Sequence, residues 1–245
     1  MFNIIADTHT HTLASDHAYS TLTENAAAAS LKGLAFMAMT EHAPAMSGAP
    51  TAMHFSCLPN LPRTINGVKI IKGAEANIMD HKGALDLEDT VLEKLEWVIA
   101  SMHLPVFAPQ DKKAHTQAWM AIAENPLIDV IGHCGDGRYD FDEETVLPAF
   151  KKYGKIVEIN AHSFAVRPGS DVNCPRIAKG CMALGIPVVV SSDAHFHTNV
   201  GHFAPAVAML DAISFPAELI LNADYARFEK AVKSLNKNRG RNMGF

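Results

Sequence analysis

Residues 2–11 of the chain read FNIIADTHTH, which is a short apolar run followed at once by Asp7, His9 and His11. The apolar part, Phe2–Ala6, predicts a strand that is buried on both faces, as strands in parallel sheets are. In parallel α/β folds, ligands bind where the strands end at their carboxyl side. This stretch therefore predicts both a parallel sheet and a functional site at its carboxyl edge.

Six further apolar runs of the same kind follow along the chain. They are Leu34–Met39, Val68–Ile71, Trp97–Ser101, Leu127–Ile131, Lys155–Ile159 and Ile186–Ser191. Helical patterns separate the runs, and seven strand–helix units in 245 residues favour a distorted, closed or nearly closed (β/α)7 barrel of the TIM type. A doubly wound open sheet is the alternative.

The helices are marked by their ends. Thr21 and Glu24 form a capping-box pattern before an alanine-rich stretch that ends at Gly33. Further helices are predicted over Glu88–Lys94, His115–Glu124, Glu143–Tyr153, Cys174–Leu184 and most of 203–236, with a break at Pro216. Pro175 suits the first turn of its helix, and Gly185 suits the C-terminal cap.

The chain shows no repeat, linker or shift in composition, so we expect one domain over residues 1–245. We expect the tail 236–245 (NKNRGRNMGF) to be poorly ordered, and the long connection 44–67 to be able to cover a site.

Composition excludes several classes of protein. With 48% apolar and 19% charged residues, the chain is globular rather than disordered. A formal net charge of −5 argues against a general nucleic-acid or anionic-membrane binder. No run is long enough to span a membrane and no signal peptide is evident, so we expect a cytoplasmic protein. The four cysteines form no CxxC pair, and we expect reduced thiols.

Thirteen histidines are present, and many fall where a predicted strand ends. Nine histidine or acidic residues share this placement or lie close to it: His9, His11, His17, His42, Glu75, His103, His133, Asp193 and His195. Buried imidazoles need partners for their ring nitrogens, and metal ions supply them. Imidazole with carboxylate suits Zn, Mn, Fe or Ni. Nine ligands exceed one tetrahedral site, so we expect two or three ions.

The same residues resemble the PHP (polymerase and histidinol phosphatase) superfamily. The resemblance runs from about residue 5 to 222, and the stretches DTHTHTLASDHAYST (7–21), GAEANI (73–78) and HLPVFAPQ (103–110) look closest to small stand-alone bacterial PHP phosphatases with a trinuclear zinc site. It implies a distorted seven-stranded barrel, three divalent ions (zinc, with manganese or iron as alternatives) and a homotrimer.

The resemblance also implies a division of the ligands into three sites. His9, His11, Glu75 and Asp193 hold the first ion; Glu75, which bridges, His103 and His133 hold the second; and His17, His42 and His195 hold the third. Glu41 replaces the usual aspartate beside His42 and is not expected to be a ligand. Cys134 follows His133 in place of the usual proline.

Other polar residues at the predicted strand ends are candidates for roles around the metal ligands or the substrate. Asp7 is expected either to accept a hydrogen bond from a ligand imidazole or to cap a strand end. Asn160, Ser163 and Arg167, and also Asn77, are candidate phosphate contacts, with Arg138 a weaker one. For His54, His81, His115, His162, His197 and His202 we expect no ligand role; His162 and His197 lie beside the site and are candidates to move protons.

Taken together, these residues predict a metal-dependent phosphatase that hydrolyses small phosphomonoesters with metal-activated water. Three alternatives stay open: a phosphodiesterase or nucleotide phosphoesterase of the same fold, another multinuclear metallohydrolase, and a non-catalytic metal buffer. We expect neither a membrane nor a nucleic-acid partner.

Overall fold

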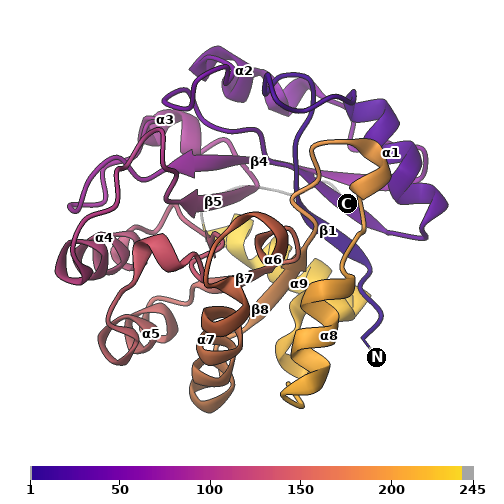
Figure 1. Ribbon diagram of the computed structural model, residues 1–245. Coiled ribbons are helices and arrows are strands. Elements are labelled where there is room, and N and C mark those ends of the chain that lie inside the picture. The colour runs from indigo at the N-terminus through magenta and orange to yellow at the C-terminus, as the bar shows by residue number, and fades with distance from the viewer. Residues whose placement is uncertain (1, 239–245) are drawn as a thin grey trace.

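A computed structural model describes residues 2–238 of the chain. Its centre is a sheet of seven parallel strands in the order β1-β2-β4-β5-β6-β7-β8. The strands are β1 (Ala6–Thr10), β2 (Phe36–Met39), β4 (Val68–Asn77), β5 (Trp97–Ser101), β6 (Val130–Ile131), β7 (Ile156–Asn160) and β8 (Val188–Ser191). Helices surround it (Figure 1).

The sheet curls into a nearly closed barrel, as the sequence predicted. At the carboxyl side, β1 and β8 meet through a parallel bridge between Thr10 and Ala194. At the amino side, Asn222 fills the gap, because its amide donates to the carbonyls of Ala6 and Val190 and accepts from the Val190 N–H. The open-sheet alternative is therefore wrong.

The helices are α1 (Leu22–Leu31), α2 (Ala52–Cys57), α3 (Asp89–Leu92), α4 (Lys112–Glu124), α5 (Glu143–Lys152), α6 (Ser163–Val166), α7 (Ser170–Leu184), α8 (Ala204–Ala212) and α9 (Tyr225–Asn238), with short 3-10 turns η1 (Leu58–Asn60), η2 (Gly137–Tyr139), η3 (His197–Asn199), η4 (Ala217–Leu219) and η5 (Leu221–Ala223). The capping box at Thr21 and Glu24 is present. Gly185 ends α7 in the left-handed region, with φ 65°, which glycine adopts without steric cost.

Several predicted boundaries were wrong. The first strand begins at Ala6, so Asp7 and His9 lie within it, and β4 continues to Asn77, so Glu75 lies inside a strand. Helix α7 begins at Ser170, which leaves Pro175 inside the helix rather than in its first turn. The connection 44–67 contains α2, η1 and β3 (Thr64–Ile65), which pairs antiparallel with β4.

Helix α9 closes the amino end of the barrel. Phe228 and Val232 join the apolar cluster inside the barrel, and the Phe228 ring lies 5.2 Å from that of Phe36 and 5.9 Å from that of Trp97. Asn236 is buried and donates to the Glu96 carbonyl, and α9 extends into the predicted tail as far as Asn238; residues 239–245 lie outside the described part. Because α9 covers the amino end of the barrel, the polar groups gather at the carboxyl ends of the strands.

The helices and the cysteines agree with two further predictions, which concern membrane spans and thiols. Among residues 2–238, no helix is both long and apolar enough to cross a membrane. All four cysteines are free thiols, as expected, and three of them are buried.

Candidate metal centre

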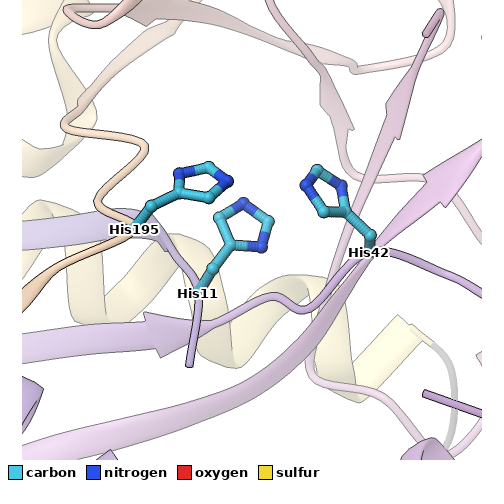
Figure 2. A group of neighbouring side chains, drawn as sticks. All are labelled: His11, His42 and His195. Carbon is cyan, nitrogen blue, oxygen red and sulfur yellow. The ribbon is translucent and has the colours of Figure 1, made fainter. Parts of the chain in front are cut away.

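The nine predicted ligands meet at the carboxyl ends of the strands. His9 lies on β1 and Glu75 on β4, while His11, His42, His103 and His133 follow β1, β2, β5 and β6 within three residues. Asp193 and His195 follow β8, and His17 comes from the segment after β1. Figure 2 shows three of the rings, His11, His42 and His195, gathered from separate segments.

Glu75 is the hub of this cluster. Its Oε1 lies 2.9 Å from His133 Nε2 and 3.2 Å from His103 Nε2. Its Oε2 lies 2.6 Å from His42 Nδ1, 3.3 Å from His9 Nε2 and 3.7 Å from His11 Nε2. One buried carboxylate therefore approaches five imidazoles from both of its oxygens, which is the arrangement that a bridging ligand requires.

Asp193 is the second carboxylate of this cluster and approaches three of its imidazoles. Its Oδ1 lies 3.2 Å from His11 Nε2, 3.6 Å from His9 Nε2 and 3.7 Å from His195 Nδ1. Its backbone has φ 53° and that of His133 has φ 26°, both in the left-handed region that non-glycine residues rarely adopt. Such strain is of the order of 1 kcal/mol or more and is concentrated at functional sites.

Potential ligand atoms fall into three groups within 4.8 Å of one another. The groups are His11 with His42 and His195, His9 with His11 and Asp193, and His42 with Glu75 and His103. His17 Nε2 lies 3.1 Å from His42 Nε2. His11 and His42 each belong to two of these groups, so the groups do not coincide with the three predicted sites. The division of the ligands among three sites stays a prediction.

The donor atoms fit a metal because many of them lack any other partner. Among the described residues, buried side-chain atoms without a hydrogen bond include His9 Nε2, both ring nitrogens of His11, His42 Nδ1, Glu75 Oε2 and His103 Nε2. An unsatisfied buried polar atom costs about 1–3 kcal/mol. These six atoms belong to five adjoining side chains, and cations that accept one lone pair from each side chain explain five of them.

The electrostatics of the cluster prepare the imidazoles for that role. Burial lowers the pKa of His11 well below its ordinary value, and the neighbouring His42 and His195 lower it further. Burial also lowers the pKa of His103 to about 4 and that of His195 by a smaller amount. These rings are therefore neutral at pH 7 and present a free lone pair, which metal binding requires.

The two carboxylates are held ionised. Burial alone would raise the pKa of Glu75, but His103, His9 and His42 hold that pKa well below its usual range. Burial opposes ionisation of Asp193 in the same way, and the pKa of Asp193 is nevertheless kept low by His9, His11 and Arg167. His9 is the exception among the rings: although burial opposes it, Glu75, Glu158 and Asp193 raise the pKa of His9 well above its ordinary value.

Glu158 is a functional residue that the sequence analysis missed. It lies on β7, fully buried, and one oxygen accepts hydrogen bonds from His9 Nδ1 and the Ser191 hydroxyl, both at 2.7 Å. The other oxygen accepts from the His133 backbone N–H at 2.7 Å. The only signal in the sequence was a carboxylate inside an otherwise apolar run.

Two roles were predicted for Asp7, and its contacts are those of the strand-end cap. Its carboxylate accepts from the backbone N–H groups of Ser192 and Gly201 and from the Ser192 hydroxyl, and no imidazole of the described residues bonds to it. Burial raises the pKa of Asp7. The residue joins β1 to the segment after β8 instead of orienting a ligand.

Asn77 orients a ligand as well. Its Oδ1 lies 2.7 Å from His103 Nδ1, and its amide nitrogen donates to the Ala43 carbonyl and to Asp86. Because the whole amide is engaged, the structure places Asn77 behind His103 and not toward a phosphate. Glu41, also buried, accepts from the Thr12 N–H and the Ser15 hydroxyl and so holds the segment that carries His11 and His17.

The three predicted substrate contacts adjoin Asp193. The Asn160 amide donates to Asp193 Oδ2 at 3.1 Å and accepts from the Ser163 N–H. Arg167 donates to Asp193 Oδ2 and to the Ser163 hydroxyl, each at 3.1 Å, and its side chain is one-tenth exposed. Arg138 is paired with Asp136, two residues before it.

The remaining histidines lie outside the cluster. His162 is half-buried, with its ring 6.3 Å from that of His195. His197 contacts Ser20. His115 is buried in α4, where Nε2 accepts from the Gln110 N–H and Nδ1 donates to the Asp140 carbonyl, so both nitrogens of this ring are engaged within the fold.

Comparison with known proteins identifies the family. The model of the PHP domain matches residues 7–162, the segment that carries most of the cluster. This chain belongs to the PHP domain family. A protein of Acetivibrio thermocellus, named a probable phosphatase, is 41% identical over 94% of this chain and 95% of its own length. A protein of Caldanaerobacter subterraneus with the same name is 44% identical over 97% and 94%.

Solved structures share the fold of this PHP protein. The histidinol phosphate phosphatase of Lactococcus lactis, solved with zinc, L-histidinol and phosphate, has a TM-score of 0.59 at 15% identity and covers 86% of this chain and 94% of its own. An archaeal ribonuclease P structure contains a chain with a TM-score of 0.59 at 12% identity. These likenesses confirm the barrel architecture of the PHP fold.

Proposed function

We propose that this PHP protein is a phosphatase that hydrolyses small phosphomonoesters at a centre of three divalent ions. One observation carries the proposal: Glu75 lies within 4 Å of five buried imidazoles, and atoms of this cluster lack hydrogen-bond partners. The close relatives named probable phosphatases support the reaction class.

The predicted ligands divide as the family resemblance implies. His9, His11, Glu75 and Asp193 hold the first ion, Glu75, His103 and His133 the second, and His17, His42 and His195 the third. Zinc is the proposed metal, since imidazole and carboxylate ligands suit it and the Lactococcus lactis phosphatase holds zinc. Bound divalent ions lower the pKa of water and offset the charge of phosphoryl oxygens.

Side chains behind the cluster fix the orientation of two of the proposed ligand rings. Glu158 holds His9 through Nδ1, and Asn77 holds His103 through Nδ1, so in each ring Nε2 is the nitrogen that faces Glu75. Such contacts behind the ligands fix the tautomer and orientation before the metal arrives.

Arg167 is the proposed phosphate contact. Among the residues described here it is the one arginine or lysine that reaches Asp193, at 3.1 Å, and a tenth of its side chain is exposed. A guanidinium can bind two phosphate oxygens at once, which aligns the ester for attack. Asn160 and Ser163 hold Arg167 and Asp193 in place from behind.

The decisive experiment combines elemental analysis with two assays. Purified protein is analysed for metals and then tested on p-nitrophenyl phosphate and on bis-p-nitrophenyl phosphate. Three metals per chain with hydrolysis of the monoester support the proposal. Three metals with cleavage of the diester alone favour the phosphodiesterase alternative, and full metal content without turnover favours a metal buffer. One metal or none, with no activity after zinc or manganese is added, contradicts the proposal.

The resemblance also implies a homotrimer of single-domain chains. The proposal predicts a particle of three 26.5 kDa chains, which light scattering measures directly. A monomer of full activity contradicts this part of the proposal and leaves the chemistry standing.

A further inference from the structure

A cavity of about 240 Å³ lies beside the cluster and is not used by any predicted ligand. One wall is the segment after β7, with His162 and helix α6, and the other is the segment from β8 to the start of α8, with Ser192, Asn199 and His202. A water molecule occupies about 30 Å³ of liquid, so the cavity has room for a group of roughly eight non-hydrogen atoms.

The cavity adjoins the proposed metal centre on two sides. Ser192, which lines it, directly precedes Asp193, and the ring of His162, which also lines it, lies 6.3 Å from the ring of His195. Asn160, two residues before His162, donates to Asp193. A phosphate at the centre and a small organic group in the cavity can therefore belong to one molecule.

Three of the four polar side chains that line the cavity are unpaired within the described part of the chain, while the fourth, Ser192, donates its hydroxyl to Asp7. Among residues 2–238, neither the ring of His162 nor that of His202 has a hydrogen-bond partner, and the same holds for the side-chain amide of Asn199. Each of these groups can donate and accept hydrogen bonds when the imidazoles are neutral. They suit hydroxyl groups or ring nitrogens of a ligand.

The rest of the lining restricts the ligand further. Phe164, Ala165 and Pro205 supply apolar surface, and no lysine, arginine, aspartate or glutamate lines the cavity. An additional phosphate would find no cation, and a carboxylate or an ammonium group would find no opposite charge, so each would lose hydration without compensation. Small sites of mixed apolar and hydrogen-bonding character bind uncharged groups.

We propose that this cavity binds the alcohol part of the substrate and selects small, uncharged, hydroxylated alcohols, with His162 as a specificity-determining residue. The inference rests on the proposed phosphatase function. It names the substrate class as monophosphate esters whose organic part carries hydroxyl groups and no charge.

A matched pair of esters tests the selection. Glycerol 3-phosphate and 3-phosphoglycerate share the phosphate ester and the adjacent hydroxyl, and differ in a hydroxymethyl group against a carboxylate. The metal-loaded wild-type protein is expected to hydrolyse glycerol 3-phosphate with a kcat/KM at least tenfold higher. Equal kcat/KM values for the two esters, with p-nitrophenyl phosphate hydrolysed, overturn the cavity proposal while the phosphatase stands. Hydrolysis of none of the three esters removes the proposed function and the cavity proposal together.

Substitutions separate the alcohol subsite from the phosphate site. His162→Ala is expected to raise the KM for glycerol 3-phosphate three- to tenfold, the effect of one lost uncharged hydrogen bond. Inhibition by inorganic phosphate, which has no alcohol part, stays within twofold of wild type, as does the metal content. His162→Gln keeps a donor and an acceptor and recovers most of the loss.

Two further variants complete the test. Ala165→Leu narrows the cavity without changing an imidazole, so it is expected to lower kcat/KM for glycerol 3-phosphate and to leave phosphate inhibition unchanged, even if His162→Ala does not fold. His81→Ala, at an exposed turn, serves as the matched control and keeps wild-type values. If inhibition by phosphate weakens in step with the KM in His162→Ala, the residue contacts the phosphate site and the proposal is wrong.

Discussion

Glu158 accepts a hydrogen bond from His9 Nδ1 at 2.7 Å, in a position where neither side chain is exposed to solvent. Burial alone would raise the pKa of Glu158, but His9 and His133 hold that pKa below its ordinary value, so the carboxylate is ionised and accepts. With Nδ1 committed, His9 presents Nε2 to Glu75 and Asp193, at 3.3 and 3.6 Å. One carboxylate behind the cluster thus decides which nitrogen of His9 can bind a metal.

Glu158→Gln is the first prediction that follows from this contact. Glutamine keeps the shape but removes the charge, and its NH2 group cannot accept a hydrogen bond, so either His9 Nδ1 or the His133 N–H loses its acceptor and the tautomer of His9 is held less firmly. We expect metal affinity to fall about 10- to 100-fold, the usual effect of removing a partner of a ligand imidazole. Competition with a chromogenic chelator measures it. Glu144→Gln, on the exposed side of α5, is the matched control, and equal affinities in both variants would contradict the role of Glu158.

Glu75→Gln tests the bridging role itself. The substitution removes the carboxylate that lies near His42, His103 and His133 together, so two proposed sites each lose a charged ligand. We expect the metal content to fall from three ions per chain to one, and phosphatase activity to fall to background. Elemental analysis and turnover are measured on the same sample, and a variant with wild-type activity would rule out Glu75 as a bridge.

His115→Ala is expected to affect stability and not chemistry. The ring is buried between α4 and the Asp140 carbonyl, and its removal leaves the Gln110 N–H and that carbonyl without partners. The loss of two partly buried hydrogen bonds costs about 1–3 kcal/mol of unfolding free energy. Urea unfolding measures this loss, while kcat and metal content of the folded protein stay at wild-type values. A loss of metal with unchanged stability would contradict this assignment.

The barrel and its chemical edge were predictable because both follow from local patterns. A run such as Ile186–Ser191 is apolar throughout because it is buried on both faces, and Asp193 then marks where it ends. The residues that converge at this edge were therefore singled out by position and type alone. Element ends were misplaced, as for β4, because the apolar pattern stops before Glu75 although the strand continues to Asn77.

What could not be predicted depends on contacts between distant segments. Glu158 and Asp7 are both buried carboxylates within strands, and only their partners distinguish them: Glu158 accepts from an imidazole 149 residues away in the sequence, while Asp7 accepts from the backbone N–H groups of Ser192 and Gly201. Asn236 is another example, because its burial against Glu96 requires α9 to close the barrel. No periodicity in the sequence carries such information.

The dependence of stability on pH provides the last prediction, which concerns the metal-free protein. In the folded chain the pKa of His103 is lowered to about 4, while the unfolded chain keeps the ordinary value near 6.5. Between these values the unfolded state binds more protons, so His103 makes the folded state less stable as pH falls. From pH 7 to 4.5 its contribution is about 2.5 kcal/mol.

Other buried groups titrate as well, so a variant isolates this contribution. The raised pKa values of His9, Asp7 and Glu41 act in the opposite direction, whereas the lowered pKa values of His11, Glu75 and Asp193 act in the same direction as that of His103. Chelator-treated wild type and His103→Gln are unfolded in urea at pH 7 and at pH 4.5. Wild type is expected to lose about 2.5 kcal/mol more than the variant over this interval. Equal losses would mean that the His103 ring is as easily protonated in the folded chain as in the unfolded one, and that the cluster does not hold it ready for a metal.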